Sequence, residues 1–426
     1  MIMQDNEKKP ALRFKGFTDP WEQRKLDEAF DFTVPNNTLS RAELNQESGS
    51  VRNVHYGDVL IKYGSVLDAQ NDELPFITER SKDDFKGALL QNGDIIIADT
   101  AEDETTGKVC EIVNIQDKDV VAGLHTMVCR PKNKTAEGYF GYYMNSSSYH
   151  HQLLPLMQGI KVLSLSKTNV QKTTVKYPKD KAEQQKIADC LRRIDTLITL
   201  HQRKYEKLVN IKKSMLDKMF PQNGASMPEI RFKGFTDPWE QRKLAEIANF
   251  SKGVGYSKND LCEEGTPIIL YGRLYTKYET SIFDVDTFVK ENAGSVYSKG
   301  GEVIVPASGE TAEDISIASV VVKPGILLGG DLNIVSPTTE YDSAFLALTI
   351  SSGAAHKYLS SLAQGKSVVH LHNADIQSVS AKFPTKREQE KIHLLFGKID
   401  TLITLHQRKL EKLQNIKKAC LEKMFV

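Results

Sequence analysis

Two stretches of the chain carry the apolar pattern of a long helix. From Glu183 to Phe220, apolar and semi-apolar residues recur in steps of four and three, and the first proline stands at Pro221. This spacing is typical of a helix that packs in a coiled coil. The stretch from Glu388 to Phe425 repeats the pattern, and the block IDTLITLHQRK is identical in both. We therefore predict two long helices that pair antiparallel through Ile187, Leu191, Ile194, Ile198, Tyr205, Leu208, Ile392, Phe396, Ile399, Ile403, Leu410 and Leu413.

A second repeat stands before each of two unlike regions. The segment RFKGFTDPWEQRKL, here called the entry motif, occurs at Arg13–Leu26 and again, letter for letter, at Arg231–Leu244. Each copy is followed by a variable region and then by one predicted helix, so the same order occurs twice. This cyclic order predicts a pseudo-twofold molecule whose two ends meet. The predicted variable domains cover residues 11–178 and 229–384, and the predicted helices cover residues 179–222 and 385–426.

The two variable regions differ in sequence but share a skeleton. Short apolar runs after a turn predict buried strands at matching places, and glycine-containing turns recur between them. The matched pairs are Gly93–Ala98 with Gly301–Pro306, Ala122–His125 with Gly329–Asp331, Gln158-Gly159 with Gln364-Gly365, TVKYP with SAKFP, and Ile61–Gly64 with Leu270–Arg273. The predicted fold is mixed α/β (α+β), with two variable domains separated by a pair of long antiparallel coiled-coil helices. One framework would thus carry two different sets of loops.

Composition narrows the class of protein. The chain has 426 residues, 40% hydrophobic and 26% charged, which suits a soluble protein with more than one domain. It has no apolar run of about 18 residues, and its opening lacks the apolar core of a signal peptide. We expect a cytoplasmic protein with no membrane contact. The formal net charge of +1 neither requires nor excludes nucleic acid, and the five cysteines lack the spacing of a metal site.

The sequence contains no convincing catalytic or metal-binding constellation. Amino methylation of adenine needs a loop of the type (D/N)PP(Y/F), and no Pro-Pro pair occurs. Gly365-Lys366-Ser367 resembles the end of a phosphate-binding loop, but Ser360 stands where its first glycine belongs. His150 and His151 are neighbours and would not face each other on a helix. The acidic cluster Asp99, Glu102, Asp103 and Glu104 is better interpreted as a solvated loop. We predict no catalytic residue and no metal.

The duplicated entry motif and helix blocks around two dissimilar domains closely resemble the specificity subunit of type I restriction-modification enzymes. The resemblance covers nearly the whole chain. It implies a non-catalytic DNA-binding subunit in which each variable domain is a target recognition domain for one half of an asymmetric, bipartite DNA site. It also implies that the paired helices act as a spacer and hold two methyltransferase subunits, and that two motor-nuclease subunits join them for restriction. S-adenosylmethionine, ATP and Mg²⁺ would belong to these partners, and this chain would need no cofactor.

Chemistry suggests which side chains would contact DNA. Phosphates attract Lys and Arg, while base edges are read by Arg, Lys, Asn, Gln and Ser on loops, with Tyr against bases or sugars. In the first variable domain these criteria select Lys62, Tyr63, Lys161, Ser164, Ser166 and Lys167. In the second they select Lys252, Tyr256, Tyr271, Arg273, Lys366, His370 and Asn373.

A protein scaffold is the alternative interpretation. In that case the two variable domains would be adaptor heads on a coiled-coil rod and would never touch DNA. A salt-dependent complex with duplex DNA, formed together with the methyltransferase, would distinguish the two functions.

Overall fold

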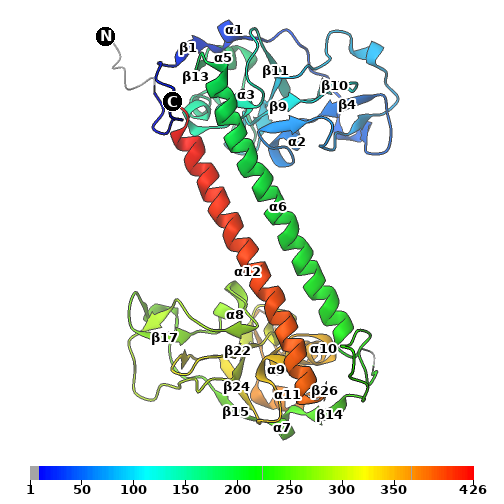
Figure 1. Ribbon diagram of the computed structural model, residues 1–426, viewed down its shortest axis with the longest axis vertical. Coiled ribbons are helices and arrows are strands. Elements are labelled where there is room, and N and C mark those ends of the chain that lie inside the picture. Colours follow the sequence, from blue (N-terminus) through cyan, green and yellow to red (C-terminus); the bar gives the residue numbers. More distant parts are fainter. Residues whose placement is uncertain (1–8, 223, 366) are drawn as a thin grey trace. The chain divides into compact units, whose positions relative to one another are not determined.

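Two long helices run through the fold, α6 (Lys181–Met219) and α12 (Lys386–Lys423) (Figure 1). The two long helices predicted from the apolar pattern are thus confirmed. The computed structural model describes residues 9–222, 224–365 and 367–426. It divides the chain into two compact units. Unit 1 contains the chain up to Leu200 together with Leu410–Val426, and unit 2 contains His201–Lys409. Each unit thus holds one variable domain, here called head 1 or head 2, and a segment of both helices.

The helices pack side by side in opposite directions. In unit 1 the Lys417 ammonium lies 2.6 Å from the Asp195 carboxylate, and in unit 2 Lys212 makes the same 2.6 Å contact with Asp400. Both aspartates belong to the identical block IDTLITLHQRK. A head hydroxyl completes each contact, since Tyr142 donates to Asp195 at 2.8 Å and Thr280 donates to Asp400 at 2.7 Å. The repeated aspartate therefore contacts both a lysine of the other long helix and a hydroxyl of the head.

An imidazole pair lies between the helices. The Nδ1 atoms of His201 and His406 are 2.7 Å apart, close enough for one hydrogen bond between them. The pKa of each imidazole is lowered, first because it is removed from water and then by positive neighbours. Lys204 and Lys409 face both rings, and His201 also meets the imidazole of His406. The neutral pair is therefore the favoured form.

Head 1 contains two main sheets and two short ribbons, and Figure 1 labels several of their strands. The five-stranded sheet has the order β2 (Phe30–Asp31), β11 (Thr126–Pro131), β7 (Ile95–Ala98), β9 (Val109–Val113) and β5 (Val66–Asp68). The four-stranded sheet has the order β10 (Asp119–Ala122), β4 (Val51–Val54), β6 (Phe76–Ile77) and β3 (Leu44–Asn45). The ribbons pair β1 (Glu22–Lys25) with β13 (Thr174–Tyr177) and β12 (Leu163–Ser164) with β8 (Thr100–Ala101). Its helices are α1 (Leu26–Ala29), α2 (Tyr56–Ile61), α3 (Tyr139–Met144), α4 (Ser147–His150) and α5 (Lys167–Gln171).

Head 2 repeats this topology strand for strand. Its five-stranded sheet has the order β15 (Ala248–Lys252), β24 (Leu332–Pro337), β20 (Glu302–Pro306), β22 (Ser319–Val321) and β18 (Ser281–Ile282). Its four-stranded sheet contains β16 (Leu261–Cys262), β19 (Phe288–Val289), β17 (Thr266–Ile269) and β23 (Leu327–Leu328). The ribbons pair β14 (Glu240–Lys243) with β26 (Ser380–Phe383) and β21 (Ser308–Gly309) with β25 (Val369–His370). Its helices are α7 (Leu244–Ile247), α8 (Arg273–Thr276), α9 (Ser343–Ile350), α10 (Gly353–Leu362) and α11 (Asn373–Ser378).

The shared skeleton predicted from the sequence is largely confirmed. The apolar runs become the buried central strands β7 and β20, and the segments TVKYP and SAKFP become β13 and β26. One pairing was wrong. Leu270–Arg273 follows β17, whose equivalent in head 1 is β4, and the residues after β4 are His55–Asp58. The dipeptide Tyr-Gly occurs twice in head 1, at Tyr56-Gly57 and Tyr63-Gly64. The strand that precedes the first copy identifies it as the true counterpart of Tyr271-Gly272.

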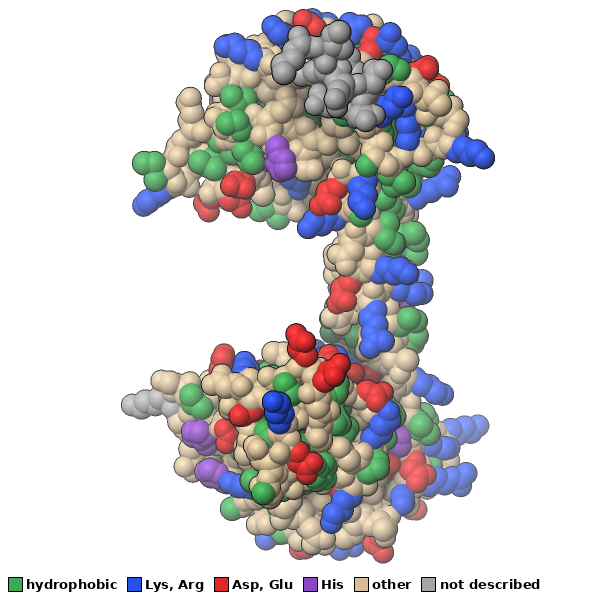
Figure 2. Space-filling view, turned by 90° about the vertical axis from the view of Figure 1, so that its left-hand side faces the viewer, with side chains coloured by type: hydrophobic (Ala, Val, Ile, Leu, Met, Phe, Trp, Pro, Cys, Tyr) green, Lys and Arg blue, Asp and Glu red, His purple; other side chains and the backbone are tan. Residues whose placement is uncertain are grey.

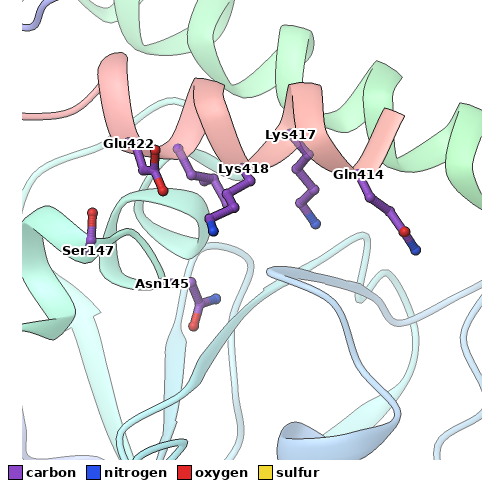
Figure 3. Close-up of a pocket in the computed structure, with 7 residues that line it drawn as sticks. Asn145, Ser147, Gln414, Lys417, Lys418 and Glu422 are labelled. Atoms are coloured by element: carbon purple, nitrogen blue, oxygen red, sulfur yellow. The ribbon is translucent and has the colours of Figure 1, made fainter. Parts of the chain in front are cut away.

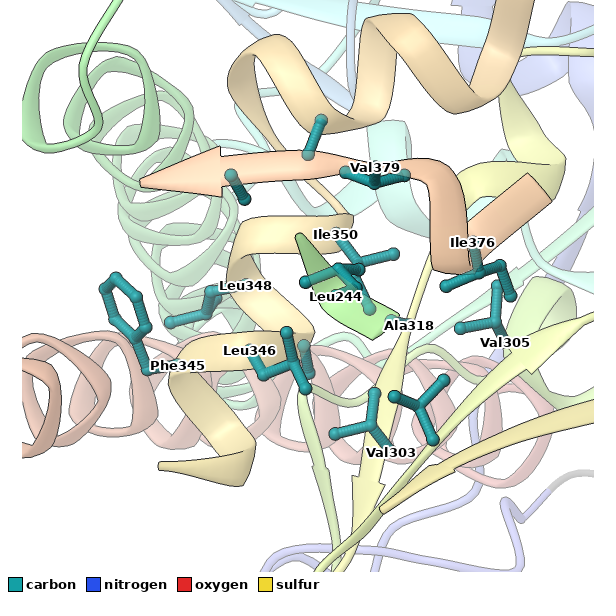
Figure 4. Packing of buried hydrophobic residues seen from close by; sticks show 14 of the residues in the cluster. Leu244, Val303, Val305, Ala318, Phe345, Leu346, Leu348, Ile350, Ile376 and Val379 are labelled. Carbon is teal, nitrogen blue, oxygen red and sulfur yellow. The ribbon is translucent and has the colours of Figure 1, made fainter. Parts of the chain in front are cut away.

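The start of each long helix is part of a head core. Ile187 and Leu191 of α6 are buried with Tyr139 and Phe140 in unit 1, and Ile392 and Phe396 of α12 are buried in unit 2. Figure 4 shows the second core, in which α9 lies between Leu244, Val379 and the strand that carries Val303. Several residues predicted for helix pairing therefore also anchor a helix to its head. Ile198, Tyr205, Leu208, Ile403 and Leu413 are half-buried along the middle of the helices.

The entry motif clamps each head to its helix. In unit 1 the Arg13 guanidinium forms two hydrogen bonds with the buried Glu183 carboxylate, at 2.6 and 2.8 Å, and Lys186 lies over the Phe17 ring at 4.9 Å. The same contacts recur in unit 2 between Arg231 and Glu388, at 2.7 and 2.8 Å, and between Lys391 and Phe235. The contacts give a reason for the repeat of the motif, since both copies bind a glutamate and a lysine that stand at the same places in the two helix starts.

The far end of the opposite helix closes each unit. In unit 1 the Leu12 amide donates to the Lys423 carbonyl at 2.7 Å, and in unit 2 the Ile230 amide donates to the Lys218 carbonyl at 2.9 Å. Phe425 then packs against Trp21 in unit 1, just as Phe220 packs against Trp239 in unit 2. The meeting of the two chain ends predicted from the cyclic order is thus present in unit 1. Within the described part of the chain, no helix is both long and apolar enough to cross a membrane.

Candidate nucleic-acid interface

Each head carries one hairpin of the same shape. In head 1 the amides and carbonyls of Gln158 and Ser164 bond to each other at 3.0 and 2.8 Å, and in head 2 Gln364 and His370 do the same at 3.2 and 2.8 Å. Gly159 and Gly365 have φ of +127° and +136°, and a Cβ on either would lie 1.9 Å from a carbonyl oxygen across the turn. Only glycine fits this point of the turn. The backbone of the two hairpins is therefore fixed in the same way.

The side chains of the two hairpins differ on this fixed backbone. Head 1 presents Ile160, which is 100% exposed, followed by the exposed Lys161 and Val162. In head 2 the sequence of the tip is Lys-Ser-Val, where Ser367 and Val368 are exposed and Lys366 lies outside the described residues. One backbone with two sets of exposed side chains is the arrangement expected of a surface that distinguishes two targets.

Strand β8 supports the hairpin in head 1, and a turn beside it completes a small polar surface. Ser164 pairs with Thr100, whose hydroxyl lies 3.4 Å from Nδ1 of His125. The His125 ring in turn lies edge-on to Tyr56, with ring centres 5.3 Å apart. The four side chains Tyr56, Thr100, His125 and Ser164 form what we call the reading surface of head 1.

Topology places four other side chains at the same points of head 2. His370 pairs with Ser308, and the Ser308 hydroxyl lies 3.1 Å from Nδ1 of His370. Asp331 stands at the place of His125, and Tyr271 stands at the place of Tyr56. The exposed side chains Tyr271, Asp331 and His370 form the reading surface of head 2, and the buried Ser308 supports the His370 ring. Each surface combines an aromatic ring with hydrogen-bonding groups on a rigid frame, as base recognition requires.

The residues predicted for DNA contact in head 1 fall into two groups. Lys161, Ser164 and Ser166 are exposed on or beside the hairpin, and Ser166 caps α5 by accepting from the Asn169 amide. Lys167 is exposed but donates to the Phe32 carbonyl. Lys62 binds Glu73 at 3.2 Å, and Tyr63 is only 4% exposed. Burial raises the pKa of the Tyr63 hydroxyl, which donates to the Glu73 carbonyl.

The predicted residues of head 2 also separate. Tyr271 and His370 belong to the reading surface, and Lys252 is exposed at the end of β15. Asn373 donates to the Ser251 carbonyl at 2.8 Å. The Tyr256 hydroxyl is held by Ser295 and Asn292. Arg273 is only 9% exposed, and its guanidinium pairs with Glu279 and Asp286 at 2.8 Å each. Such a buried, doubly paired guanidinium has a structural role in holding α8.

A comparison with known proteins decides which of the two interpretations holds. The family model described as type I restriction modification DNA specificity domain matches residues 18–210 and 236–415. The chain belongs to this DNA specificity family. It is a DNA specificity subunit of a type I restriction-modification system, and the family of specificity subunits is non-catalytic. The scaffold interpretation is therefore set aside.

Individual relatives agree with this family. The type I restriction enzyme MjaVIII specificity subunit of Methanocaldococcus jannaschii is 24% identical over 256 residues, which are 57% of this chain and 60% of that relative. A sequence assigned to the type I restriction enzyme MjaX specificity subunit of the same organism is 22% identical over 412 residues, or 94% of this chain and 91% of the relative. The crystal structure of the S subunit of a type I restriction-modification system from M. genitalium shares the fold, with a TM-score of 0.64 at 14% identity, covering 98% and 99% of the two chains.

Sequence reasoning missed Tyr56, Thr100, His125, Ser308 and Asp331 in this specificity subunit. A signal existed for His125 and Asp331, because the segments that contain them were already matched between the two heads. Tyr56 was missed because the wrong Tyr-Gly pair was aligned. Thr100 and Ser308 follow the central strands directly, and nothing in their local sequence indicates that a distant hairpin pairs with them.

The helices of the specificity subunit carry a second kind of surface. Apolar residues of the repeated blocks remain exposed on both helices, namely Leu197, Leu200, Ile211, Leu402, Leu405 and Ile416. Two leucines of this set lie in each unit, Leu197 and Leu200 in unit 1 and Leu402 and Leu405 in unit 2. At about 100° per residue, the two leucines of a pair lie about 60° apart on their helix. Lys and Arg side chains also project from the helices (Figure 2). Because the amino acids at these positions are the same on both helices, this surface occurs twice.

A cavity lies in unit 1 where α12 passes head 1 (Figure 3). Its volume is about 320 Å³, and Asn145 and Ser147 face Lys417, Lys418 and Glu422 of α12. Lys417 is already paired with Asp195. The cavity thus marks the contact between helix and head and holds no arrangement of a base, nucleophile and proton donor.

Proposed function

We propose that each head reads one half of an asymmetric, bipartite DNA site. The observation that carries this proposal is the pair of reading surfaces, which share a backbone and differ in side chains. Two equal frames would each present the same kind of surface to one target, and the different side chains would make the two targets unlike. The domains at 11–178 and 229–384 would then be the two target recognition domains.

The geometry reduces the set of proposed contacts. Lys161, Ser164, Ser166, Lys252, Tyr271 and His370 remain exposed and are kept, together with the reading surfaces. Tyr63 and Arg273 are buried, and their groups already have partners inside the head. We assign these two residues to the framework. Exposed lysines near the hairpins would hold phosphates, while the reading surfaces would contact base edges.

The repeated helix surfaces fit two copies of one partner. We infer that each exposed leucine pair, Leu197 with Leu200 in unit 1 and Leu402 with Leu405 in unit 2, docks one methyltransferase subunit. Two identical surfaces bind two identical subunits, whereas the unlike reading surfaces cannot. Two motor-nuclease subunits would join the complex for restriction. S-adenosylmethionine would bind to the methyltransferase, and ATP and Mg²⁺ to the partner subunits. The helices between the two heads would set the length of the unread spacer.

A domain exchange tests the proposal. The wild-type complex with its methyltransferase is incubated with plasmid DNA and S-adenosylmethionine, and methyladenine is mapped by sequencing. Replacing 27–176 with the matching domain of another family member is expected to change one half of the methylated site only. The same chain purified without partners is expected neither to methylate nor to cut DNA. A change in both halves, or a wild-type complex that methylates no defined site, would contradict the proposal.

A further inference from the structure

One turn places different chemistry at the same strained point of both heads. His125 stands before β11 in head 1 and Asp331 stands before β24 in head 2, with φ of +54° and +56°. The carbonyl of His125 accepts from the Asp99 amide at 3.0 Å, and the carbonyl of Asp331 accepts from the Ala307 amide at 2.8 Å. The two backbones are therefore equivalent in conformation and in hydrogen bonding.

This backbone conformation is unfavourable for a residue with a side chain. A left-handed φ costs a non-glycine residue roughly 1 kcal/mol, and glycine adopts it without that cost. Among the described residues other than glycine, six have such a φ, and His125 and Asp331 form the pair that recurs at matched positions. Since glycine would serve the turn better, the side chains must contribute something that the turn itself does not need. Such strain is concentrated at binding and catalytic sites.

Both side chains are available to an external partner. Asp331 is exposed, and the His125 side chain is 46% exposed. Each residue holds the backbone at the start of the strand that supports its hairpin, because Ala307 precedes Ser308 and Asp99 precedes Thr100. The two side chains therefore lie within the reading surfaces.

The chemistry of the pair indicates contact with bases. A carboxylate only accepts hydrogen bonds and repels phosphates, so on a DNA-binding surface it needs an amino group of cytosine or adenine. An imidazole can donate to an acceptor such as purine N7. A docking surface for two copies of one protein would carry the same residue twice, and here the residues differ. This difference favours DNA over a protein partner as the occupant.

We propose that His125 and Asp331 are specificity-determining residues, which rests on the proposed function of the heads. Asp331 accepts an amino proton from cytosine or adenine in the half-site of head 2. His125 donates to a base acceptor at the equivalent place in the half-site of head 1. The turn holds each side chain at a fixed distance from its hairpin, so each head reads this base together with those that the hairpin contacts.

The test exchanges the carboxylate for an amide. Asp331→Asn keeps the size of the side chain and suits a left-handed φ, so the fold is retained. The variant is assembled with the methyltransferase, and plasmid methylation is mapped as for the wild-type complex. We expect at least a tenfold fall in methylation rate at the wild-type site, or a changed base at one position of the half read by head 2. The half read by head 1 stays the same.

Two further variants separate recognition from folding. Asp331→Gly removes the strain, so unit 2 should unfold at an equal or higher temperature while losing the same discrimination. Glu79→Gln is the matched control, because Glu79 is an exposed carboxylate with φ of +54° outside the reading surfaces. This control should leave both half-sites and the methylation rate unchanged.

Each other outcome has a definite meaning. An unchanged map and rate for Asp331→Asn would overturn the role of Asp331 and leave the proposed function standing. Changes in both half-sites would also overturn the role of Asp331. Loss of the methyltransferase from the Asp331→Asn complex would overturn it too, because it would show that a protein covers this surface. A wild-type complex that methylates no defined site would instead refute the proposed function.

Discussion

Removing Arg231 should destabilise unit 2 strongly, because its partner is a fully buried carboxylate. The Glu388 side chain is 0% exposed, and within the described residues both of its oxygens receive hydrogen bonds from Arg231 alone. Removing one member of a buried ion pair typically costs about 3 to 5 kcal/mol, because the remaining charge has no partner. For a unit of this size, about 1 kcal/mol shifts the midpoint of unfolding by roughly 2 to 4 °C. Arg231→Ala should therefore lower the transition of unit 2 by roughly 6 to 20 °C.

The equivalent residue of unit 1 is the matched control. Glu183 accepts from Arg13 and also has the Trp21 indole nitrogen at 3.4 Å, so Arg13→Ala leaves one donor in place. We expect Arg13→Ala to cost less in unit 1 than Arg231→Ala costs in unit 2. The two tryptophans of the chain, Trp21 in unit 1 and Trp239 in unit 2, allow both transitions to be followed by fluorescence. A Trp21→Phe background reports unit 2 alone.

The pH dependence provides a second check on the cause. A buried carboxylate that has lost its counter-charge is costly only in its ionised form. The deficit of Arg231→Ala should then be smaller at pH 5 than at pH 8. A loss of unfolding free energy below about 1 kcal/mol, the range of exposed ion pairs, would show that the stability of unit 2 does not depend on this buried charge. A deficit independent of pH would show the same.

Three further predictions follow from other contacts. Burial raises the pKa of Glu111 to about 7, against 4.5 when exposed. The free energy of unfolding of unit 1 should thus fall by about 3 kcal/mol as pH rises from about 4.5 to 7, and no further above that pH. Urea titrations should measure this fall in the wild-type chain and should not find it in Glu111→Gln. Because the pKa of His201 and His406 is lowered, the neutral pair stabilises unit 2 fully above about pH 6.5. This stabilisation is lost as pH falls through the folded pKa. Changing both histidines to Gln should remove this acid sensitivity from the thermal melts of unit 2. Inserting four residues near Thr199 adds about 6 Å to the helix, close to two base pairs of about 3.4 Å each. Methylation mapping should show a longer spacer with both half-sites unchanged, and an unchanged spacer at full activity would mean that the helices do not measure the distance.

The repeats allowed most of the architecture to be predicted from the sequence. A helix stripe of four and three steps is a local signal, and identical letters at Arg13–Leu26 and Arg231–Leu244 identify equivalent contacts without any knowledge of the contacts themselves. The burial of Ile187 and Ile392 in the heads could not be predicted in the same way. An apolar stripe shows that a face is covered, but it does not show whether a helix or a sheet covers it.

The reading surfaces were the part least accessible to sequence reasoning. Selection by residue type chose Tyr63 and Arg273, because Tyr and Arg are common DNA contacts, but Arg273 finds two carboxylates and Tyr63 a carbonyl inside the head. Thr100 and Ser164 are 64 positions apart in the chain, and only strand pairing brings them together. The feature that distinguishes His125 is its left-handed φ. The sequence indicates such a φ for glycine but not for other residues.

The crossed packing of Phe425 and Phe220 has a consequence for a half-length chain. Each head takes its closing aromatic ring from the helix that follows the other entry motif, so one repeat alone cannot complete its own core. A protein ending after Pro221 would expose the pocket around Trp21 and Tyr139 while offering a free Phe220. Two such molecules could exchange these ends reciprocally and form a true homodimer. Its heads would be identical, and the sequence it reads would be an inverted repeat.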